Sequence, residues 1–503
     1  MKSKKKSSQS KRNSSAIKVA VKTGDMPSAE FRKFGYKMVD WIADYLENIE
    51  DLPVFPAIKP GDIKKKLPKH PPKKGESFEK IFADFNKIII PGTTHWNHPK
   101  FLAYFNSAGS GPGVLAELLS AALNTNAMVW KSGPASTELE RVTMNWLRDL
   151  IGLPEKFWGI IYDTASVSTM HAIASAREEI AGAEIRRKGL TVIKNIKGLR
   201  LYCSEQAHSS VEKGAVALGI GMEGVRKIPV DKDFKMIPGR LAEAIKEDRG
   251  LGWLPFCVVA TIGTTSTTSI DPVDEIAGIC SEEKLWLHVD SAHAGITAVL
   301  PEMRFHFKGV EKADSFVFNP HKWMFVPVDL SAYYTRKPEI LKSAFSIVPE
   351  YLKTAEDDSV QNLMDYGIQL GRRMRSLKLW FVLRYFGAEG ISARVREHLR
   401  LGKLFTGWID GDLNFERMAP VPFSTICFRL HPKEINDELK LNELNEKLLG
   451  TLNKTGEVFL SHTKLNNKFV IRVSISGLKT EERHINEVWK LLKSKSAEIL
   501  KTQ

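Results

Sequence analysis

The sequence lacks the features that mark several common classes of protein. No stretch is long and apolar enough to span a bilayer, and no apolar segment follows the basic residues at the N-terminus. We therefore expect neither a membrane association nor a secretory signal. Only four cysteines are present, far apart and without a CxxC pair, which argues against a disulfide framework or a zinc site and fits a reducing compartment. The expected location is the cytoplasm.

Acidic residues are absent from the first 24 positions, which hold seven Lys and one Arg and supply more than half of the net charge of +14. This composition is typical of a disordered tail. A second basic run, 64–74, is interrupted by three prolines and indicates an exposed connector. Because neither run carries interleaved aromatic residues, we expect no nucleic-acid partner. The alternative is a catalytically silent basic protein that binds a nucleic acid or an anionic surface through this tail.

The pattern of apolar residues predicts an α/β protein with several domains. Residues 26–51 have the spacing of an amphipathic helix with Ser28 as its N-cap, and further helices are expected over 77–90 and 113–151. From about residue 158, short apolar runs alternate with helical segments, which indicates a mostly parallel sheet with helices on both faces. The predicted strands are 159–162, 199–203, 256–261, 285–289, 315–318 and 331–334.

A smaller α/β unit is predicted after about residue 390. Its expected elements are a helix over 392–408, strands over 425–430 and 469–474, and a final helix from 481. The first helix of the chain precedes a proline-rich loop, a position that suits packing on a partner subunit. The predicted parts are a disordered basic tail (1–25), an N-terminal helical dimerisation segment (26–109), a large cofactor-binding domain (110–389) and a small C-terminal domain (390–503).

A lysine follows a predicted buried strand in the segment SFVFNPHKWMF, residues 315–325. Lys322 is surrounded by aromatic residues there, which is an unusual place for a surface ammonium. Desolvation lowers the pKa of a lysine, and a neutral amine can form a Schiff base with a carbonyl cofactor. Lys322 is therefore the first candidate catalytic residue.

Four other motifs place polar groups just past predicted strands, where ligands bind in sheets of this kind. Asp290 could hold a pyridinium nitrogen protonated, although an Asp at that place also caps helices. His208 could stack on a pyridine ring, or it could be a structural histidine. The segment 164–166 opens a helix whose free N–H groups suit a phosphate, and Thr264 and Thr265 end a further strand.

Taken together, these motifs supply every part of a site for pyridoxal 5'-phosphate (PLP). The sequence has no GxGxxG at a suitable strand–helix turn, no GxxxxGK[ST] and no HExxH. We therefore expect PLP as the cofactor and no metal.

The sequence closely resembles the group II PLP-dependent amino-acid decarboxylases, in the branch that acts on aromatic L-amino acids. The resemblance runs from about Glu30 to the C-terminus. It implies PLP fold-type I (aspartate aminotransferase-like), an obligate homodimer with an intertwined N-terminal segment, and decarboxylation of tryptophan, tyrosine, phenylalanine or dopa to the amine and CO2. The segments that carry it are HPKFLAYF (98–105), STELE (136–140), EQAHSSVEK (205–213), GTTS (263–266), WLHVDSAHAG (286–295), FNPHKW (318–323) and LGRRMRSLKLW (370–380).

The resemblance implies a role for each residue of the cofactor site. Lys322 would carry the cofactor as a Schiff base, and Asp290 would pair with the pyridinium nitrogen. Ala292 would pack under the ring, while His208 would stack on its other face and Thr265 would help to position both. The residues that would hold the phosphate are Thr164, Ala165, Ser166, Asn319 and His321.

Tyr351, in VPEYLK, matches a tyrosine that a mobile loop brings over the site in this family to protonate the α-carbon. Related aldehyde synthases typically carry Phe there, and some others replace the stacking histidine by Asn. Because Tyr351 and His208 are both present, decarboxylation to the amine is favoured. The alternatives are a PLP-dependent aldehyde synthase and a decarboxylase of another amino acid, such as histidine or glutamate.

Further positions match the family's substrate-binding residues. Trp96, Tyr104 and Phe105 match the pocket for the aromatic side chain. Asn126 and Met128 match positions that reach toward the neighbouring subunit's site. Gly371 matches a position that is associated with a preference for indole or phenol rings.

The sequence also departs from the family at several places. Asp163, just before the phosphate segment, stands where animal members have Gly. The other departures are Asn106, Ser107, Val167 and His293. None removes a catalytic group, but they leave the choice of substrate open.

Overall fold

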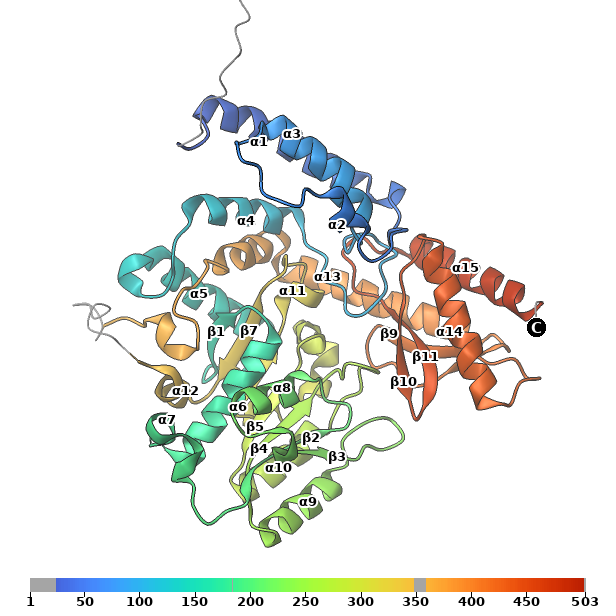
Figure 1. Cartoon of the computed structure of the whole chain (residues 1–503). Coiled ribbons are helices and arrows are strands. Elements are labelled where there is room, and N and C mark those ends of the chain that lie inside the picture. Colours follow the sequence, from blue (N-terminus) through green and yellow to red (C-terminus); the bar gives the residue numbers. More distant parts are fainter. Residues whose placement is uncertain (1–23, 183, 348–358, 502–503) are drawn as a thin grey trace, which may run out of the picture. The chain divides into compact units, whose positions relative to one another are not determined.

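The computed structural model describes residues 24–182, 184–347 and 359–501 (Figure 1). The chain divides into two compact units, one formed by Met1–Ile49 and Pro56–Thr93 and the other by Glu50–Phe55 and Thr94–Gln503. The described part of the first unit is helical, whereas the second holds both β-sheets. Within the described ranges, no helix combines the length and the apolar character needed to cross a bilayer.

Aromatic contacts hold the helices of the smaller unit together. Trp41 packs edge-on against Phe85 with ring centroids 5.2 Å apart, and its indole N–H donates to Asn86 Oδ1 at 2.8 Å. These contacts join the first helix to the segment that continues the third one as a turn of π-helix. The helices of this unit are α1 (Ser28–Glu47), α2 (Asp62–Lys66) and α3 (Phe78–Asp84).

The predicted N-cap of α1 is wrong, although the helix itself is confirmed. The N-cap is Pro27, at φ −58° and ψ 141°, and Ser28 is the first helical residue. The proline ring fixes φ at a value suited to the residue before a helix, so the serine hydroxyl comes one position too late to act as the cap. In α3 the expected pattern holds, because Ser77 Oγ accepts from the backbone N–H of Lys80 at 3.3 Å.

The central sheet is mostly parallel, as predicted. Its seven strands lie in the order β1–β7–β6–β5–β4–β2–β3, and β7 alone is antiparallel to its neighbours. Thr261 pairs with Asp290, and Asp290 pairs with Val317, so β4, β5 and β6 end at the same edge. The strands are β1 (Trp158–Tyr162), β2 (Gly198–Ser204), β3 (Val225–Ile228), β4 (Trp253–Thr261), β5 (Trp286–Asp290), β6 (Ser315–Phe318) and β7 (Ser331–Thr335).

Helices cover both faces of this sheet, because its alternate side chains enter two separate cores. Val259 packs with residues of α6 (Ala165–Ala181) and α8 (Ser210–Ala217). Its neighbour Val258 belongs instead to a core shared with α5 (Pro134–Leu150), α9 (Pro238–Gly250) and α10 (Val273–Glu283). The other helices of this part are α4 (Gly111–Leu123), α7 (Glu184–Lys188), α11 (Pro320–Trp323) and α12 (Pro338–Phe345).

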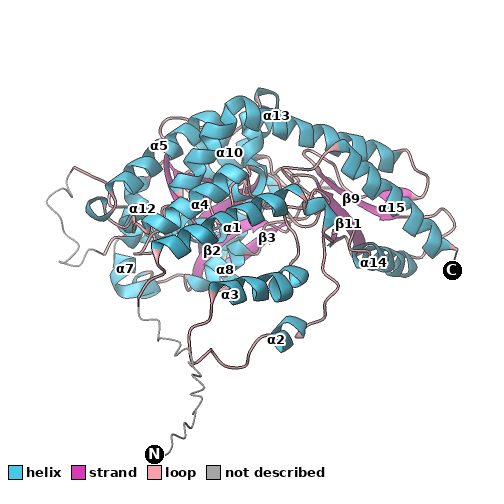
Figure 2. Ribbon diagram, turned by 90° about the horizontal axis from the view of Figure 1, so that it is seen from above, coloured by secondary structure: helices cyan, strands magenta, loops and turns pink. Residues whose placement is uncertain are grey.

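A second, antiparallel sheet of four strands follows in the chain. One long helix, α13 (Ser376–Asp410), extends from α5 to this sheet (Figure 2) and breaks at Gly387, whose φ of 64° favours glycine. The predicted helix over 392–408 is therefore the second half of α13. The sheet has the order β10–β11–β9–β8, and its elements are β8 (Phe415–Arg417), β9 (Thr425–Leu430), β10 (Ser461–Leu465), β11 (Lys468–Ser474), α14 (Glu438–Lys454) and α15 (Glu482–Leu500).

We predict that Asn445 of α14 is needed for the stability of the small sheet. Its buried amide accepts from Leu430 N at 2.7 Å and donates to Leu430 O at 2.9 Å. Asn445→Leu leaves both backbone groups of β9 without these partners and should destabilise the protein by roughly 2–4 kcal/mol, measured as a lower urea midpoint. Leu439→Ala, at an exposed position of the same helix, should change stability by less than about 0.5 kcal/mol. Equal midpoints for the two variants would contradict the prediction.

Candidate active site

Most of the predicted site residues line one cavity of about 380 Å³. It lies at the edge where β4, β5 and β6 end, beside the start of α6. The predicted residues that line it are Tyr104, Phe105, Thr164, Ala165, Ser166, His208, Thr265, Asp290, Ala292, Asn319, His321 and Lys322.

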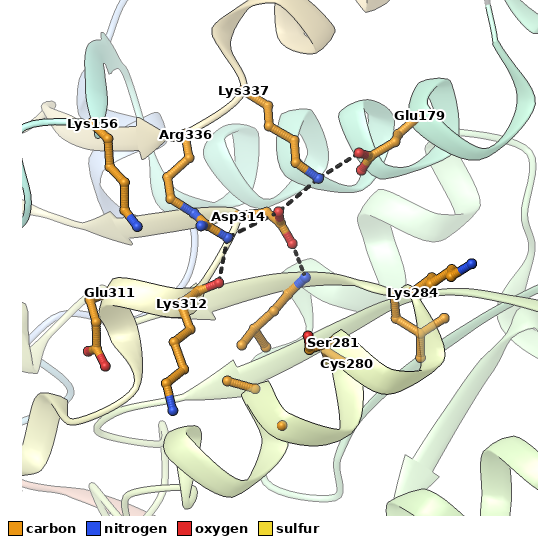
Figure 3. Close-up of a pocket in the computed structure, with 14 residues that line it drawn as sticks. Lys156, Glu179, Cys280, Ser281, Lys284, Glu311, Lys312, Asp314, Arg336 and Lys337 are labelled. Atoms are coloured by element: carbon orange, nitrogen blue, oxygen red, sulfur yellow. Dashed lines mark hydrogen bonds and ion pairs between the residues drawn. The ribbon is translucent and has the colours of Figure 1, made fainter.

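A larger cavity, about 710 Å³, lies at the opposite edge of the sheet (Figure 3). Its lining is strongly charged, but the central charges are paired with one another. Lys337 Nζ lies 2.5 Å from Glu179 Oε1 and 2.9 Å from Asp314 Oδ1, and Asp314 also accepts from Leu287 N at 2.9 Å. These ion pairs and hydrogen bonds stabilise the amino ends of the strands. None of the predicted site residues lies in this cavity.

Lys322 lies in the short helix α11, directly after β6. Its backbone N–H donates to Asn319 O at 2.9 Å, and its Nζ lies 5.3 Å from the centre of the Phe105 ring. Burial lowers the pKa of Lys322, while the negative charge of Asp290 acts in the opposite direction. A larger share of the side chain is therefore the neutral amine, the form that can attack a carbonyl.

Asp290 is the last residue of β5 and is 4% exposed. Its Oδ1 accepts from the backbone N–H of Ala292 at 3.0 Å, which fixes the carboxylate at the cavity wall. Burial lowers the pKa of both Lys322 and His208, and the negative charge of this carboxylate partly opposes that shift in each.

His208 is held by the turn that precedes α8. Its Nδ1 lies 2.9 Å from Ser210 Oγ and accepts from Ser210 N at 3.1 Å, so the imidazole caps this helix. Burial lowers the pKa of His208, and the charge of Asp290 partly opposes this effect. The hydrogen bond at Nδ1 assigns the proton of the neutral ring to Nε2.

The aromatic residues form a continuous wall. The rings of Phe105 and His293 stack with centroids 3.8 Å apart, and His293 stacks in turn on Trp323 at 4.8 Å. Tyr104 has φ of 51°, in the left-handed region, and its ring stacks on Trp96 at 6.1 Å. Trp96 itself does not line the cavity but extends the wall outward.

Three predicted substrate residues lie together outside the cavity. The amide oxygen of Asn126 accepts from Arg372 N at 2.9 Å, and its amide nitrogen lies 3.6 Å from the sulfur of Met128. A side chain added at Gly371 would meet Asn126 Nδ2 at 3.8 Å, which is ordinary contact. Tyr351 lies outside the described residues.

Arg472 of β11 is a cavity residue that sequence reasoning missed. Its Nε donates to Ser266 O and its Nη2 donates to Thr265 O, both at 2.8 Å. The guanidinium carbon lies 5.3 Å from the centre of the Phe105 ring. An arginine inside the largely apolar strand KFVIRVS gives no signal of such a role. The other missed lining residues are Thr261, Gly263 and His293.

Comparisons with known proteins identify the family of this chain. Residues 60–431 match the pyridoxal-dependent decarboxylase conserved domain. The chain belongs to this family. It is 40% identical over 494 residues to the aromatic-L-amino-acid decarboxylase of Bos taurus, covering 95% of this chain and 98% of that protein. It is 37% identical to tryptophan decarboxylase 2 of Oryza sativa subsp. japonica, covering 94% of this chain and 96% of that protein.

Solved structures of similar enzymes share its fold, PLP fold-type I. The Oryza sativa TDC with PLP and tryptamine superposes with a TM-score of 0.91 at 33% identity, covering 95% of this chain and 99% of that one. The 4-hydroxyphenylacetaldehyde synthase of Rhodiola rosea superposes with a TM-score of 0.87 at 32% identity, covering 94% of this chain and 99% of that one.

The cavity of this decarboxylase fits PLP. Among the described residues, the N–H groups of Ala165 and Ser166 at the start of α6 have no protein acceptor, and the buried Asn319 Oδ1 has no partner. His321 Nδ1 accepts from Leu330 N at 2.9 Å, and burial lowers the pKa of His321 to about 4. The neutral ring therefore has a donor left at Nε2. Free donors at a helix N-terminus suit a phosphate. No cluster of metal-binding side chains occurs in the described part of the chain.

We predict that Arg472 positions the turn that carries Thr265. Arg472→Met removes the partners of two carbonyls at the cavity rim, so it should destabilise the protein by about 2–3 kcal/mol and weaken PLP binding about tenfold. Thermal unfolding and titration of the visible cofactor band measure the two effects. Arg417→Met on β8 removes a partly exposed ion pair with Asp410, so it should change stability by less than about 1 kcal/mol and leave PLP affinity unaltered. Unchanged PLP affinity in Arg472→Met would refute the positioning role.

Proposed function

We propose that this protein removes the α-carboxylate of an aromatic L-amino acid (tryptophan, tyrosine, phenylalanine or dopa) and releases the amine and CO2, with PLP as its cofactor. The observation that carries the proposal is a single cavity that joins Lys322 and Asp290 to the aromatic wall of Tyr104 and Phe105. The names of the relatives, aromatic-L-amino-acid decarboxylase and tryptophan decarboxylase, support the same substrate class.

When bound, the cofactor supplies a pyridinium ring that accepts the electron pair left by departing CO2. In this proposal Lys322 anchors the cofactor through Nζ, because burial favours its neutral amine. Asp290, at the end of β5, would keep the ring nitrogen protonated. The imidazole of His208 would cover one face of the ring, and Ala292 would pack under the other. Thr265 would help to position His208 and the ring.

The remaining residues are proposed to bind the side chain of the substrate and the phosphate of the cofactor. The aromatic wall, which Trp96 extends, would hold the substrate side chain and so orient the α-carboxylate for its departure. Tyr351 is proposed, from the family resemblance, as the acid that protonates the α-carbon. The residues proposed to bind the phosphate are Thr164, Ala165, Ser166, Asn319 and His321.

The test is an assay of purified protein with PLP and six L-amino acids: tryptophan, tyrosine, phenylalanine, dopa, histidine and glutamate. We expect CO2 and the amine from at least one aromatic acid. Lys322→Ala should abolish the visible cofactor band and lower turnover by about 10³-fold or more, since the anchoring amine is lost. Lys156→Ala, at an exposed loop position, should keep both.

The products separate this proposal from its alternatives. An aldehyde with ammonia and peroxide in place of the amine would identify an aldehyde synthase, the activity named for the Rhodiola rosea neighbour. Amine from histidine or glutamate alone would contradict the aromatic substrate class. A Lys322→Ala variant that keeps the band would contradict the role of Lys322.

We also propose that the protein is a homodimer. Helix α4 supports this, because it carries a row of exposed leucines: Leu115, Leu118 and Leu119 are 52%, 54% and 47% exposed. Large apolar patches of this kind mark protein interfaces. The position of Asn126, Met128 and Gly371 outside the cavity also fits residues that serve a neighbouring subunit's site.

Replacing both Leu115 and Leu119 by Glu should shift the protein from dimer to monomer, because it would place charges inside the proposed interface. Light scattering after size exclusion measures the mass. Leu251→Glu, at an exposed position just after α9, serves as the matched control and should remain dimeric. A wild-type protein that is monomeric at micromolar concentration would refute the dimer.

The domain limits and the cellular location are proposed on separate grounds. The large sheet lies within 110–389 and the small sheet within 390–503, which supports these two domains, and 26–109 stays proposed as the dimerisation segment. Four buried, unpaired cysteines support a reducing compartment, and we propose the cytoplasm.

A further inference from the structure

The carboxylate of Asp163 accepts hydrogen bonds from donors that are proposed to bind the cofactor phosphate. Asp163 directly precedes Thr164, the N-cap residue of α6. Its Oδ1 accepts from the backbone N–H of Thr164 at 2.6 Å and from the Thr164 hydroxyl at 3.2 Å. The two hydrogen-bond donors of Thr164 are therefore both used by the neighbouring side chain.

The other carboxylate oxygen has a neutral partner. Asp163 Oδ2 accepts from the amide of Gln369 at 3.0 Å. Among the residues that the structure describes, no Lys, Arg or His forms an ion pair with Asp163. Among these residues no cation therefore neutralises the carboxylate, which lies next to the place where a doubly charged phosphate has to bind.

Two anions at one helix N-terminus compete for the same attraction. The free N–H groups and the dipole of α6 favour a negative group at this end, whether it is a side chain or a phosphate. A phosphate that binds Thr164 must take its donors from Asp163, and like charges at such short range repel each other. Ala165 and Ser166 keep their N–H groups free, so a phosphate can still bind there, but less tightly.

We propose that Asp163 competes with the cofactor phosphate for Thr164 and so weakens the binding of PLP to this protein. The inference rests on the cofactor site proposed above. Gln369 donates to the second oxygen of the Asp163 carboxylate. This hydrogen bond can persist when the donors of Thr164 bind the phosphate instead of Asp163. Asp163 is therefore a residue that sets cofactor affinity, acting through Thr164.

The test compares two ligands on the full-length apoprotein. PLP and pyridoxal carry the same aldehyde and ring, but pyridoxal lacks the phosphate. Asp163→Asn removes the charge and keeps an amide oxygen that can accept from Thr164. Titration of the visible cofactor band should show PLP bound about 5- to 20-fold more tightly by the variant than by the wild type, whereas pyridoxal affinity should change less than twofold.

Further variants separate charge from shape. Asp163→Glu retains the negative charge and should keep PLP affinity within a fewfold of the wild type. Asp149→Asn, at an exposed position near the end of α5, removes the same net charge elsewhere and should leave both affinities unchanged. If Asp163→Asn does not fold, Asp163→Ser, which keeps a small acceptor, carries the same expectation.

Three results would overturn the proposal. PLP affinity that is equal or weaker in Asp163→Asn would show that the carboxylate does not oppose the phosphate. An equal gain for PLP and pyridoxal would show that the effect does not act through the phosphate. The absence of any visible band in the wild type and in all variants would overturn the proposed cofactor site itself. A band that is present in all of them with the same affinity for PLP would overturn only the role of Asp163.

Discussion

A lysine at the end of a buried strand is stable only when its surroundings favour the neutral amine or supply a countercharge. Lys322 has both, because burial lowers its pKa while Asp290 opposes that shift from the neighbouring strand. This balance depends on the common edge at which β4, β5 and β6 end, since the register of the sheet places the last residue of β5 beside β6. The cavity, the helix termini around it and the chemistry proposed for it all depend on that edge.

The inner strands could be predicted from the sequence because most of their residues are apolar. Thr425–Leu430 and Ser315–Phe318 have the limits expected for them. The strands that were missed, β3, β8 and β10, lie at sheet edges and have polar side chains that face solvent. Such strands form because a neighbour offers hydrogen bonds, and a single sequence does not reveal that neighbour.

The candidate site divides in the same way. Residues placed just past apolar strands, such as Asp290 and Lys322, were predictable because the strand pattern itself locates them. Arg472 was not, since it comes from the other sheet and its sequence context is an ordinary strand. His208 was predicted, but its hydrogen bond to the first turn of α8 was not. Local chemistry of this kind depends on rotamers, which the sequence does not show.

The wall of the cavity is assembled from distant parts of the chain, from Tyr104 to Arg472. During synthesis on the ribosome, the segments that carry Asp290 and Lys322 emerge well before β11. The site therefore lacks the Arg472 guanidinium, and the carbonyls of Thr265 and Ser266 lack their donor, until β11 has been made. Capture of the cofactor by a complete pocket must then follow the synthesis of β11, and a nascent chain that stalls before β11 cannot reach it.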